Sequence, residues 1–313
     1  MSTGARRCLV IGGNGFIGSH LVDALRAAGN SVRVFDAGAP RPDMDWSGVD
    51  YRRGAFDAAA EVAAALDGVD TVFHLVSTTV PSTSNKDPVA DIQGNLVASV
   101  ALMRAMIDRG LRRLVFFSSG GTVYGNPSRL PVPEDHPLEP ISSYGVVKAA
   151  IERYLLMYGK LGQLDPLILR PGNPYGPRQG AAGIQGVIPA FLRRVRDGER
   201  LQIWGDGGVV RDYLYIADLV DLAVAAGLSD KNGVFNAGSG VGHSLLDIVA
   251  EIARATGRQP AIDFHPARNF DVDALVLDVT RARSELGWQP RVSLAEGMDR
   301  TWKAMSAADP VGS

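Results

Sequence analysis

The feature that most constrains the fold is a glycine-rich turn close to the N-terminus. The apolar run Cys8–Ile11 leads into Gly12-Gly13-Asn14-Gly15-Phe16-Ile17-Gly18, and the stretch Ile17–Ala28 has a helical composition. Glycines let the backbone turn tightly and approach a ligand, while the helix dipole and free N–H groups attract an anion. The motif therefore predicts a pyrophosphate site between a strand and a helix, although such turns also occur as purely structural connections.

A carboxylate follows at the spacing that a dinucleotide site requires. Asp36 ends the next apolar run, Val32–Phe35, and lies 18 residues after Gly18. At this place an acidic side chain would hydrogen-bond the ribose diol of an adenosine. The turn and the carboxylate together favour a dinucleotide site over a structural turn.

Composition narrows the class of protein. The 313 residues are 46% hydrophobic and 21% charged, as in ordinary soluble proteins, and the net charge of −2 indicates neither nucleic acid nor an anionic membrane as a partner. Cys8 is the single cysteine, so disulfides within the chain and cysteine-rich zinc sites are excluded, and we expect no metal. The first apolar run is too short for a signal peptide or a membrane span. A cytoplasmic location is expected.

Short β-branched runs alternate with helical stretches along the first half of the chain. The expected strands are Cys8–Ile11, Val32–Phe35, Val49–Arg52, Thr71–Leu75, Leu114–Ser118 and Leu167–Arg170, and the intervening helices include Ala58–Leu66, Val89–Arg109 and Ser142–Leu161. This alternation predicts an α/β protein with a Rossmann-type, doubly wound parallel sheet. Ligands of such sheets lie at the carboxyl ends of strands, here just after Leu75 and Phe117.

The pattern changes after residue 170. The segment 171–180 is irregular, and the expected elements beyond it are the helices Val187–Arg196, Ile216–Gly227, Leu245–Thr256 and Leu294–Met305 and the strands Leu201–Trp204 and Val234–Ala237. A loop rich in Asp and Arg is expected around Asp263–Asp278. We therefore expect a dinucleotide-binding domain at 1–170, to which 209–240 returns, and a smaller C-terminal substrate-binding lobe at 171–208 and 241–313.

The second chemical signal is Tyr144-Gly-Val-Val-Lys148. Residues four apart on a helix lie on one face, so the two side chains would be neighbours. A tyrosine is a poor base at neutral pH, but a nearby ammonium favours the phenolate and lowers the pKa. The pair would then act as a general acid and base on a sugar or alcohol hydroxyl. A Tyr and a Lys at this spacing are weak evidence for a catalytic pair by themselves, but here they follow the predicted dinucleotide-binding turn.

Several motifs carry a family resemblance across nearly the whole chain. They are the glycine turn, Asp36, His74-Leu75, Ser118-Ser-Gly-Gly-Thr-Val-Tyr-Gly125, Tyr144 with Lys148, the run Leu169–Arg178, Val210–Tyr213 and the segment Leu286–Pro290. As a set they resemble the extended short-chain dehydrogenases/reductases, and within them the NAD-dependent sugar-nucleotide epimerase/dehydratase family.

The resemblance implies NAD as the cofactor. It places Gly12, Gly15, Phe16, Ile17 and Gly18 at the pyrophosphate, Asp36 at the adenosine ribose, Leu75 and Pro171 along the cofactor, and Tyr144 and Lys148 at the nicotinamide end. A carboxylate at position 36 would repel the additional phosphate of NADP. Tyr144 would remove the proton from the reacting sugar hydroxyl, and Lys148 would hold the nicotinamide ribose.

The resemblance also implies a nucleotide-sugar substrate. Its contacts would include Asn173, Val187, Trp204, Arg211, Arg268 and Leu275, with the two arginines on the diphosphate and Val187 and Trp204 near the nucleobase. A guanidinium fits phosphate geometry well. The alternative for Arg211 is a salt bridge with Asp212 or Asp218.

Two positions depart from the family pattern. Gly120 stands where the family usually has a Ser or Thr that hydrogen-bonds the reacting hydroxyl, so Ser118, Ser119 or Thr122 would have to replace it. Ala55 stands where a carboxylate usually contacts adenine, and Asp57 is a poor substitute.

The segment around Gly120 also helps to predict which reaction is catalysed. Dehydratases of this family need an Asp-Glu pair where this chain has Gly121 and Thr122, which argues against dehydration. Epimerisation at C4 needs the tyrosine, a retained NAD and space for the keto-sugar to rotate, and Gly120 and Gly121 would add such space. Leu275, at a position that limits sugar size, leaves N-acetylated sugars acceptable.

The leading hypothesis is thus a 4-epimerase of a UDP-hexose or UDP-N-acetylhexosamine. The alternatives are a nucleotide-sugar reductase, dehydratase or decarboxylase on the same scaffold, and a non-catalytic NAD-sensing protein. The resemblance further implies a homodimer formed through Val89–Arg109 and Ser142–Leu161, although core packing alone could explain the apolar character of both helices.

Overall fold

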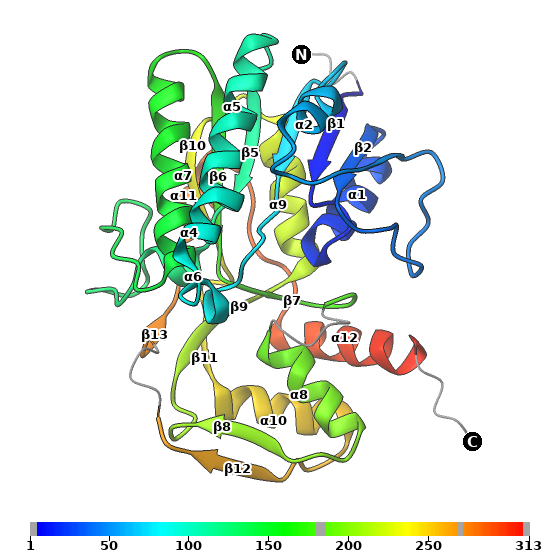
Figure 1. Cartoon of the computed structure of the whole chain (residues 1–313). Coiled ribbons are helices and arrows are strands. Elements are labelled where there is room, and N and C mark those ends of the chain that lie inside the picture. Colours follow the sequence, from blue (N-terminus) through cyan, green and yellow to red (C-terminus); the bar gives the residue numbers. More distant parts are fainter. Residues whose placement is uncertain (1–4, 180–185, 268–271, 309–313) are drawn as a thin grey trace.

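A seven-stranded parallel sheet forms the centre of the larger part of the molecule (Figure 1). The computed structural model describes residues 5–179, 186–267 and 272–308. In spatial order the strands are β3 (Asp50–Arg53), β2 (Ser31–Asp36), β1 (Arg7–Ile11), β4 (Thr71–His74), β5 (Arg113–Phe117), β6 (Asp165–Pro171) and β10 (Gly233–Ala237). The order reverses between β1 and β4, and ligands of doubly wound sheets bind at such a reversal. The predicted Rossmann-type fold is confirmed.

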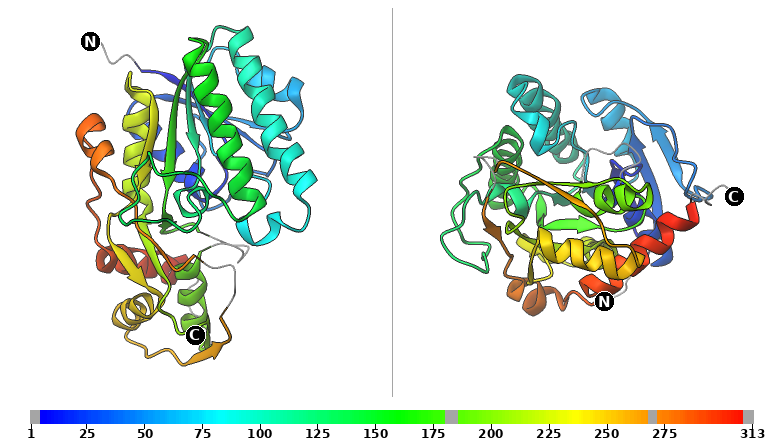
Figure 2. Two further views of the ribbon diagram at one scale, coloured as in Figure 1. Left: turned by 90° about the vertical axis from the view of Figure 1, so that its left-hand side faces the viewer. Right: turned by 90° about the horizontal axis from the view of Figure 1, so that it is seen from below.

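Helices cover both faces of this sheet because side chains along each strand alternate between the faces. In β1, Cys8 and Val10 pack under α1 (Phe16–Ala27) and α9 (Ile216–Leu228). The other two apolar residues, Leu9 and Ile11, pack on the opposite face. That face is covered by α2 (Ala59–Ala65), α5 (Ala98–Asp108) and α7 (Ser143–Lys160), and Figure 2 shows α5 beside α7.

A smaller lobe lies at the carboxyl end of the sheet (Figure 1). Its strands are β7 (Asn173–Tyr175), β8 (Leu201–Trp204), β9 (Val210–Tyr215), β11 (Gly242–Ser244), β12 (Ile262–His265) and β13 (Ala274–Leu275), and its helices are α8 (Val187–Arg196), α10 (Leu245–Thr256) and α12 (Leu294–Ala308). Strand β9 pairs with β7, β11 and β13, and β8 pairs with β12. The apolar core under α9 continues into this lobe, so the two parts share one core.

The helix expected at Val89–Arg109 is interrupted. It consists of α4 (Pro88–Asp91), a π-helical segment η1 (Ile92–Val97) and α5. The Asn95 side chain donates to the backbone oxygen of Asp91 at 3.1 Å, and such insertions into the backbone ladder widen a helix locally. Hydrophobic spacing does not distinguish a π-turn from an α-turn, so one continuous α-helix was the wrong expectation.

Several short helices and strands were not predicted from the sequence. The irregular segment 171–180 contains β7, the loop expected around Asp263–Asp278 contains β13 and the end of β12, and three further helices are α3 (Pro81–Ser84), α6 (Gly120–Val123) and α11 (Thr280–Leu286). Each is too short to produce a recognisable period. Within the described ranges, no helix combines the length and apolar character needed to cross a membrane.

A buried ion pair joins α7 to β6 beneath the carboxyl edge of the sheet. Arg170 Nη2 lies 2.6 Å from Glu152 Oε2, with side-chain exposures of 4% and 1%. Arg170 also donates to the Tyr124 hydroxyl at 2.8 Å, and that hydroxyl donates to Asn236 at 2.7 Å. Helix α7, strands β6 and β10, and Tyr124 at the end of α6 are thereby connected through buried groups.

We expect Arg170→Met to lower the free energy of unfolding by about 3–5 kcal/mol, because it leaves the Glu152 carboxylate buried without its cation. The measurement is equilibrium denaturation in urea. Arg112→Met is the matched control, since Arg112 pairs with Asp165 at 2.9 Å on the exposed surface, where water replaces a lost partner. Equal losses of stability in the two variants would contradict this account.

Candidate active site

The glycine turn brings α1 unusually close to β1 and β4. A Cβ on Gly18 would lie 2.1 Å from the Gly12 carbonyl oxygen, and a Cβ on Gly12 would lie 2.8 Å from Val76 N. Gly12 also has φ +87°, a left-handed conformation that favours glycine. Helix α1 begins at Phe16, beside the reversal point of the sheet. Gly15 supplies no side-chain cap, so the first N–H groups of the helix are left for another acceptor. This cradle fits a pyrophosphate.

Asp36 lies at the mouth of the same turn. Its carboxylate accepts hydrogen bonds from Asn14 N at 3.0 Å and Gly38 N at 2.9 Å. These contacts hold the end of β2 against the glycine turn. Leu75 directly follows β4, and Pro171 ends β6, so both lie at the carboxyl edge where the cofactor was predicted.

Tyr144 and Lys148 lie in the first two turns of α7. The Ser142 side chain caps this helix by accepting from Gly145 N at 3.2 Å. The ammonium of Lys148 is buried, donates to the Phe117 carbonyl at 2.9 Å and lies 5.6 Å from the centre of the Tyr144 ring. The structure therefore brings the pair together at the end of β5, one turn apart, as the sequence predicts.

Burial changes the proton affinities of this pair. Loss of water raises the pKa of the Tyr144 phenol to about 12 and lowers the pKa of the Lys148 ammonium to about 8. The expectation that the Tyr144 phenol has a lowered pKa was therefore wrong for this structure, because desolvation is the largest influence on the phenol. A hydrogen bond from Ser119 lowers the Tyr144 pKa, while the Asp91 carboxylate raises it.

The three candidate hydroxyls after β5 have different surroundings. Ser118 is buried and donates to Glu152, within the ion-pair network of Arg170. Ser119 lies beside Tyr144, and its hydroxyl lowers the pKa of the phenol. Thr122 Oγ1 is buried and has no hydrogen-bond partner among the described residues. The structure thus places Ser119 beside the tyrosine. The Thr122 hydroxyl has no hydrogen-bond partner in the described part of the chain, whereas the Ser118 hydroxyl is bound within the core.

Gly120 does not open the space that the sequence suggests. A Cβ there would lie 2.9 Å from both the Arg170 carbonyl oxygen and Leu277 Cδ1. Gly121 is different, since its nearest contact would be Asn173 Oδ1 at 3.9 Å. The expectation of added space therefore holds for Gly121 and was wrong for Gly120, which packs against β6.

Residues of the smaller lobe face the same edge of the sheet. Asn173 begins β7, and its Nδ2 is buried without a partner in the described part of the chain. Strands β9 and β13 place Arg211 beside Leu275. The Asp212 carboxylate accepts from Ser239, Gly240 and Leu277, and the Asp218 carboxylate accepts from Val292.

The two residues expected near a nucleobase lie further out on this lobe. Val187 begins α8, and Trp204 ends β8 with 40% of its surface exposed. The Trp204 ring stacks on His265 at 5.2 Å between centres. Arg268 lies outside the described residues.

The sequence reading missed a polar stripe along the interrupted helix. Asp91, Asn95 and Ser99 are spaced four apart and buried. Hydrogen bonds connect them, since Asn95 Nδ2 donates to Asp91 Oδ1 at 2.9 Å and Ser99 Oγ donates to Asn95 O at 2.6 Å. Polar residues at helical spacing on an apolar face were the available signal.

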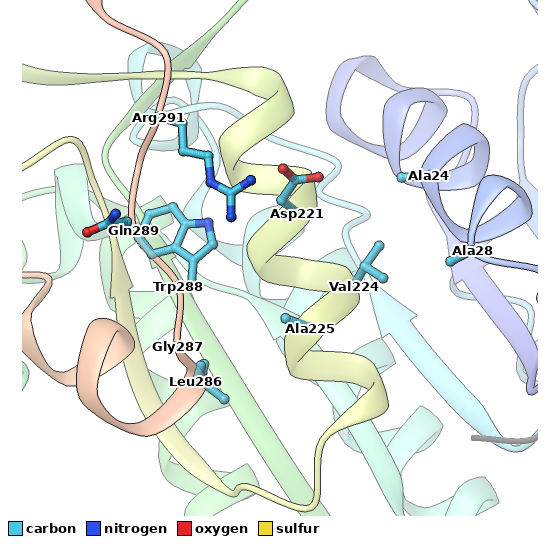
Figure 3. Close-up of a pocket in the computed structure, with 10 residues that line it drawn as sticks. All are labelled: Ala24, Ala28, Asp221, Val224, Ala225, Leu286, Gly287, Trp288, Gln289 and Arg291. Carbon is cyan, nitrogen blue, oxygen red and sulfur yellow. The ribbon is translucent and has the colours of Figure 1, made fainter. Parts of the chain in front are cut away.

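A groove elsewhere on the surface is unrelated to this site. Figure 3 shows it between α1, α9 and the segment 286–291. It is lined by Ala24, Ala28, Asp221, Val224, Ala225, Leu286, Gly287, Trp288, Gln289 and Arg291, none of which was predicted as a site residue.

The fold and the Tyr144–Lys148 pair define an enzyme of the extended short-chain dehydrogenase/reductase type. Residues 8–238 match the model of the NAD dependent epimerase/dehydratase family. The chain belongs to that family.

Relatives and solved structures of several activities cover almost the whole chain. It is 41% identical over 303 residues to the UDP-glucose 4-epimerase of Mycolicibacterium smegmatis, covering 94% of this chain and 97% of that one. It is 32% identical over 308 residues to a dTDP-4-dehydro-6-deoxyglucose reductase of Escherichia coli, covering 95% and 96%. The structure of Thermus thermophilus UDP-glucose 4-epimerase with NAD matches with a TM-score of 0.91 at 35% identity, covering 97% and 100%.

We expect Gly18→Ala to weaken NAD binding at least about tenfold, because the added methyl would meet the Gly12 backbone and push α1 away from the turn. Isothermal titration calorimetry with NAD measures this loss. Gly121→Ala is the control, since its methyl would make only ordinary contacts. Wild-type affinity in Gly18→Ala would show that the turn does not hold the cofactor.

Proposed function

We propose that the protein is an NAD-dependent nucleotide-sugar 4-epimerase that interconverts C4 epimers of a UDP-hexose or UDP-N-acetylhexosamine through a 4-keto sugar. The observation that carries the proposal is the Tyr144–Lys148 pair at the carboxyl edge, beside a glycine cradle and Asp36. The 41% identity to a UDP-glucose 4-epimerase supports the reaction. A UDP-N-acetylglucosamine 4-epimerase of Methanobrevibacter ruminantium, with a TM-score of 0.90 and 27% identity, supports the wider range of sugars.

In the proposed reaction Tyr144 takes the proton of the C4 hydroxyl and returns it after the keto-sugar has turned over. When bound, NAD supplies a two-electron acceptor that is restored within the same turnover. Lys148, fixed by the Phe117 carbonyl, would hold the nicotinamide ribose and place a positive charge beside the phenol. The Ser119 hydroxyl, which lowers the pKa of the phenol, would stabilise the phenolate.

Gly120 has no hydroxyl to hydrogen-bond the reacting sugar hydroxyl. We assign this role to Thr122, and we assign to Ser119 the stabilisation of the Tyr144 phenolate. Thr122 Oγ1 and Asn173 Nδ2 are both buried polar atoms without partners in the described ranges, and a buried polar group is normally hydrogen-bonded. Sugar hydroxyls would satisfy both. Dehydration is disfavoured because Gly121 and Thr122 offer no acid and base.

We further propose that 1–170 and 209–240 bind NAD, and that 171–208 and 241–313 bind the nucleotide-sugar. In the second part Arg211 and Arg268 would hold the diphosphate, Val187 and Trp204 would border the nucleobase, and Leu275 would limit the sugar. The exposed indole of Trp204 supports a stacking role. The substrate and the single buried cysteine support a cytoplasmic location.

Incubation with UDP-glucose, UDP-galactose and their N-acetylated counterparts tests the reaction. Proton NMR should show interconversion of C4 epimers without net consumption of NAD. We expect Tyr144→Phe to reduce turnover at least about a hundredfold, because the proton acceptor is lost, while NAD still binds. A reductase would instead consume reduced cofactor stoichiometrically with a keto-sugar. That outcome, or full activity in Tyr144→Phe, would refute the proposal.

We also propose a homodimer formed through the α4–α5 and α7 helices, which lie side by side. Apolar side chains are exposed on both, including Val89, Ile92, Val97, Tyr154 and Met157 at 40–63%. Such patches mark interaction surfaces when they are contiguous.

Light scattering after size-exclusion chromatography should give a dimer for the wild type and a monomer for the double variant Val97→Glu, Met157→Glu, because buried charges without partners oppose association. Phe264→Glu, on the equally exposed but distant β12, should remain dimeric. A monomeric wild type would exclude this interface.

A further inference from the structure

Asp91 is a carboxylate with no exposed surface, close to the reacting pair. Its Oδ1 accepts from Thr79 Oγ1 at 2.6 Å and from Asn95 Nδ2 at 2.9 Å, and its Oδ2 accepts from Ser143 Oγ at 2.7 Å. All three donors are neutral. Neutral groups thus surround both carboxylate oxygens, and a buried carboxylate is costly unless a nearby cation compensates its charge.

These hydrogen bonds join three segments that border the site. Thr79 belongs to the loop after β4, and Asn95 lies in η1, where its Oδ1 also accepts from Thr78 N at 2.8 Å. Ser143 is the first residue of α7 and directly precedes Tyr144. One carboxylate thus fixes the start of the helix that carries the tyrosine to the loop at the reversal of the sheet.

Two carboxylates, Asp91 and Glu152, raise the pKa of Lys148, and they differ in their own partners. Glu152, one turn further along α7, is neutralised by Arg170 at 2.6 Å. His74 on β4 is uncharged, because burial holds its pKa well below the usual value and its Nε2 lies 2.8 Å from Ser99 Oγ. Lys148 itself is hydrogen-bonded to a neutral carbonyl. The Asp91 charge raises the pKa of both Tyr144 and Lys148.

We propose that Asp91 is a positioning residue that fixes Tyr144 through Ser143, and that its buried charge sets the pH range in which Tyr144 and Lys148 act. The part of this inference that concerns turnover rests on the proposed epimerase function. The part that concerns the phenol does not, because the ionisation of Tyr144 can be measured directly.

Asp91→Asn preserves the shape of the side chain and removes its charge. Without that charge the phenolate is less disfavoured and the ammonium is less favoured, so both proton affinities fall. We expect the acid and alkaline limits of the pH–rate profile to move together to lower pH by about one unit. Ultraviolet absorbance of the phenolate, taken as the difference between each protein and its Tyr144→Phe counterpart, should show the same shift without any turnover.

Three further variants separate charge from position. Ser143→Ala removes the link to α7 but keeps the charge, so it should lower kcat without moving the profile. Asp87→Asn removes an exposed carboxylate that caps α4, the helix of Asp91, by accepting from Ala90 N, and it should change neither kcat nor the pH profile. Asp91→Ser removes the charge with a smaller side chain. If Asp91→Asn does not fold, Asp91→Ser should show the shift of the pH profile to lower pH that is expected for Asp91→Asn.

An unchanged Tyr144 titration in folded Asp91→Asn or Asp91→Ser would overturn the proposal, whatever the activity. A shifted titration in a protein that epimerises none of the sugars would instead reject the proposed function and leave the electrostatic role of Asp91 standing.

Discussion

The close approach of α1 to the carboxyl ends of β1 and β4 is the constraint on which the site depends. It exists because Gly12 and Gly18 have no side chains, so the backbone of one turn can touch the backbone of the next. The N–H groups of α1 then point to the reversal of the sheet, and Asp36 is drawn in by Asn14 and Gly38. The reacting pair on α7 is positioned relative to this fixed edge through Phe117.

Much of this arrangement could be predicted from the sequence because its signals are local. The strand–turn–helix pattern, the carboxylate after the second strand and the four-residue spacing of Tyr144 and Lys148 each depend on neighbouring residues. The sheet was predicted because alternating strands and helices permit few topologies. The family match then confirmed the fold and the class of reaction.

What the sequence could not supply depends on contacts between distant segments. The π-helical segment coincides with a hydrogen bond from the Asn95 side chain to the Asp91 carbonyl, and the Ser118 hydroxyl is bound by Glu152 of the distant helix α7. The proton affinities of Tyr144 and Lys148 depend on how much water the folded chain removes, which no spacing encodes. Asp91 was overlooked for the same reason, since a polar residue in a helical pattern does not reveal its partners.

The packing of Gly120 against β6 has a consequence for how such a site can change over time. A serine introduced there would have its Cβ 2.9 Å from the Arg170 carbonyl oxygen and Leu277 Cδ1, so the hydroxyl common in the family can be regained only if these neighbours shift. In this protein β6 or the segment at Leu277 would have to move first, and otherwise the polar contact stays on Ser119 and Thr122. The small side chain at one position thereby restricts the order in which neighbouring positions can mutate.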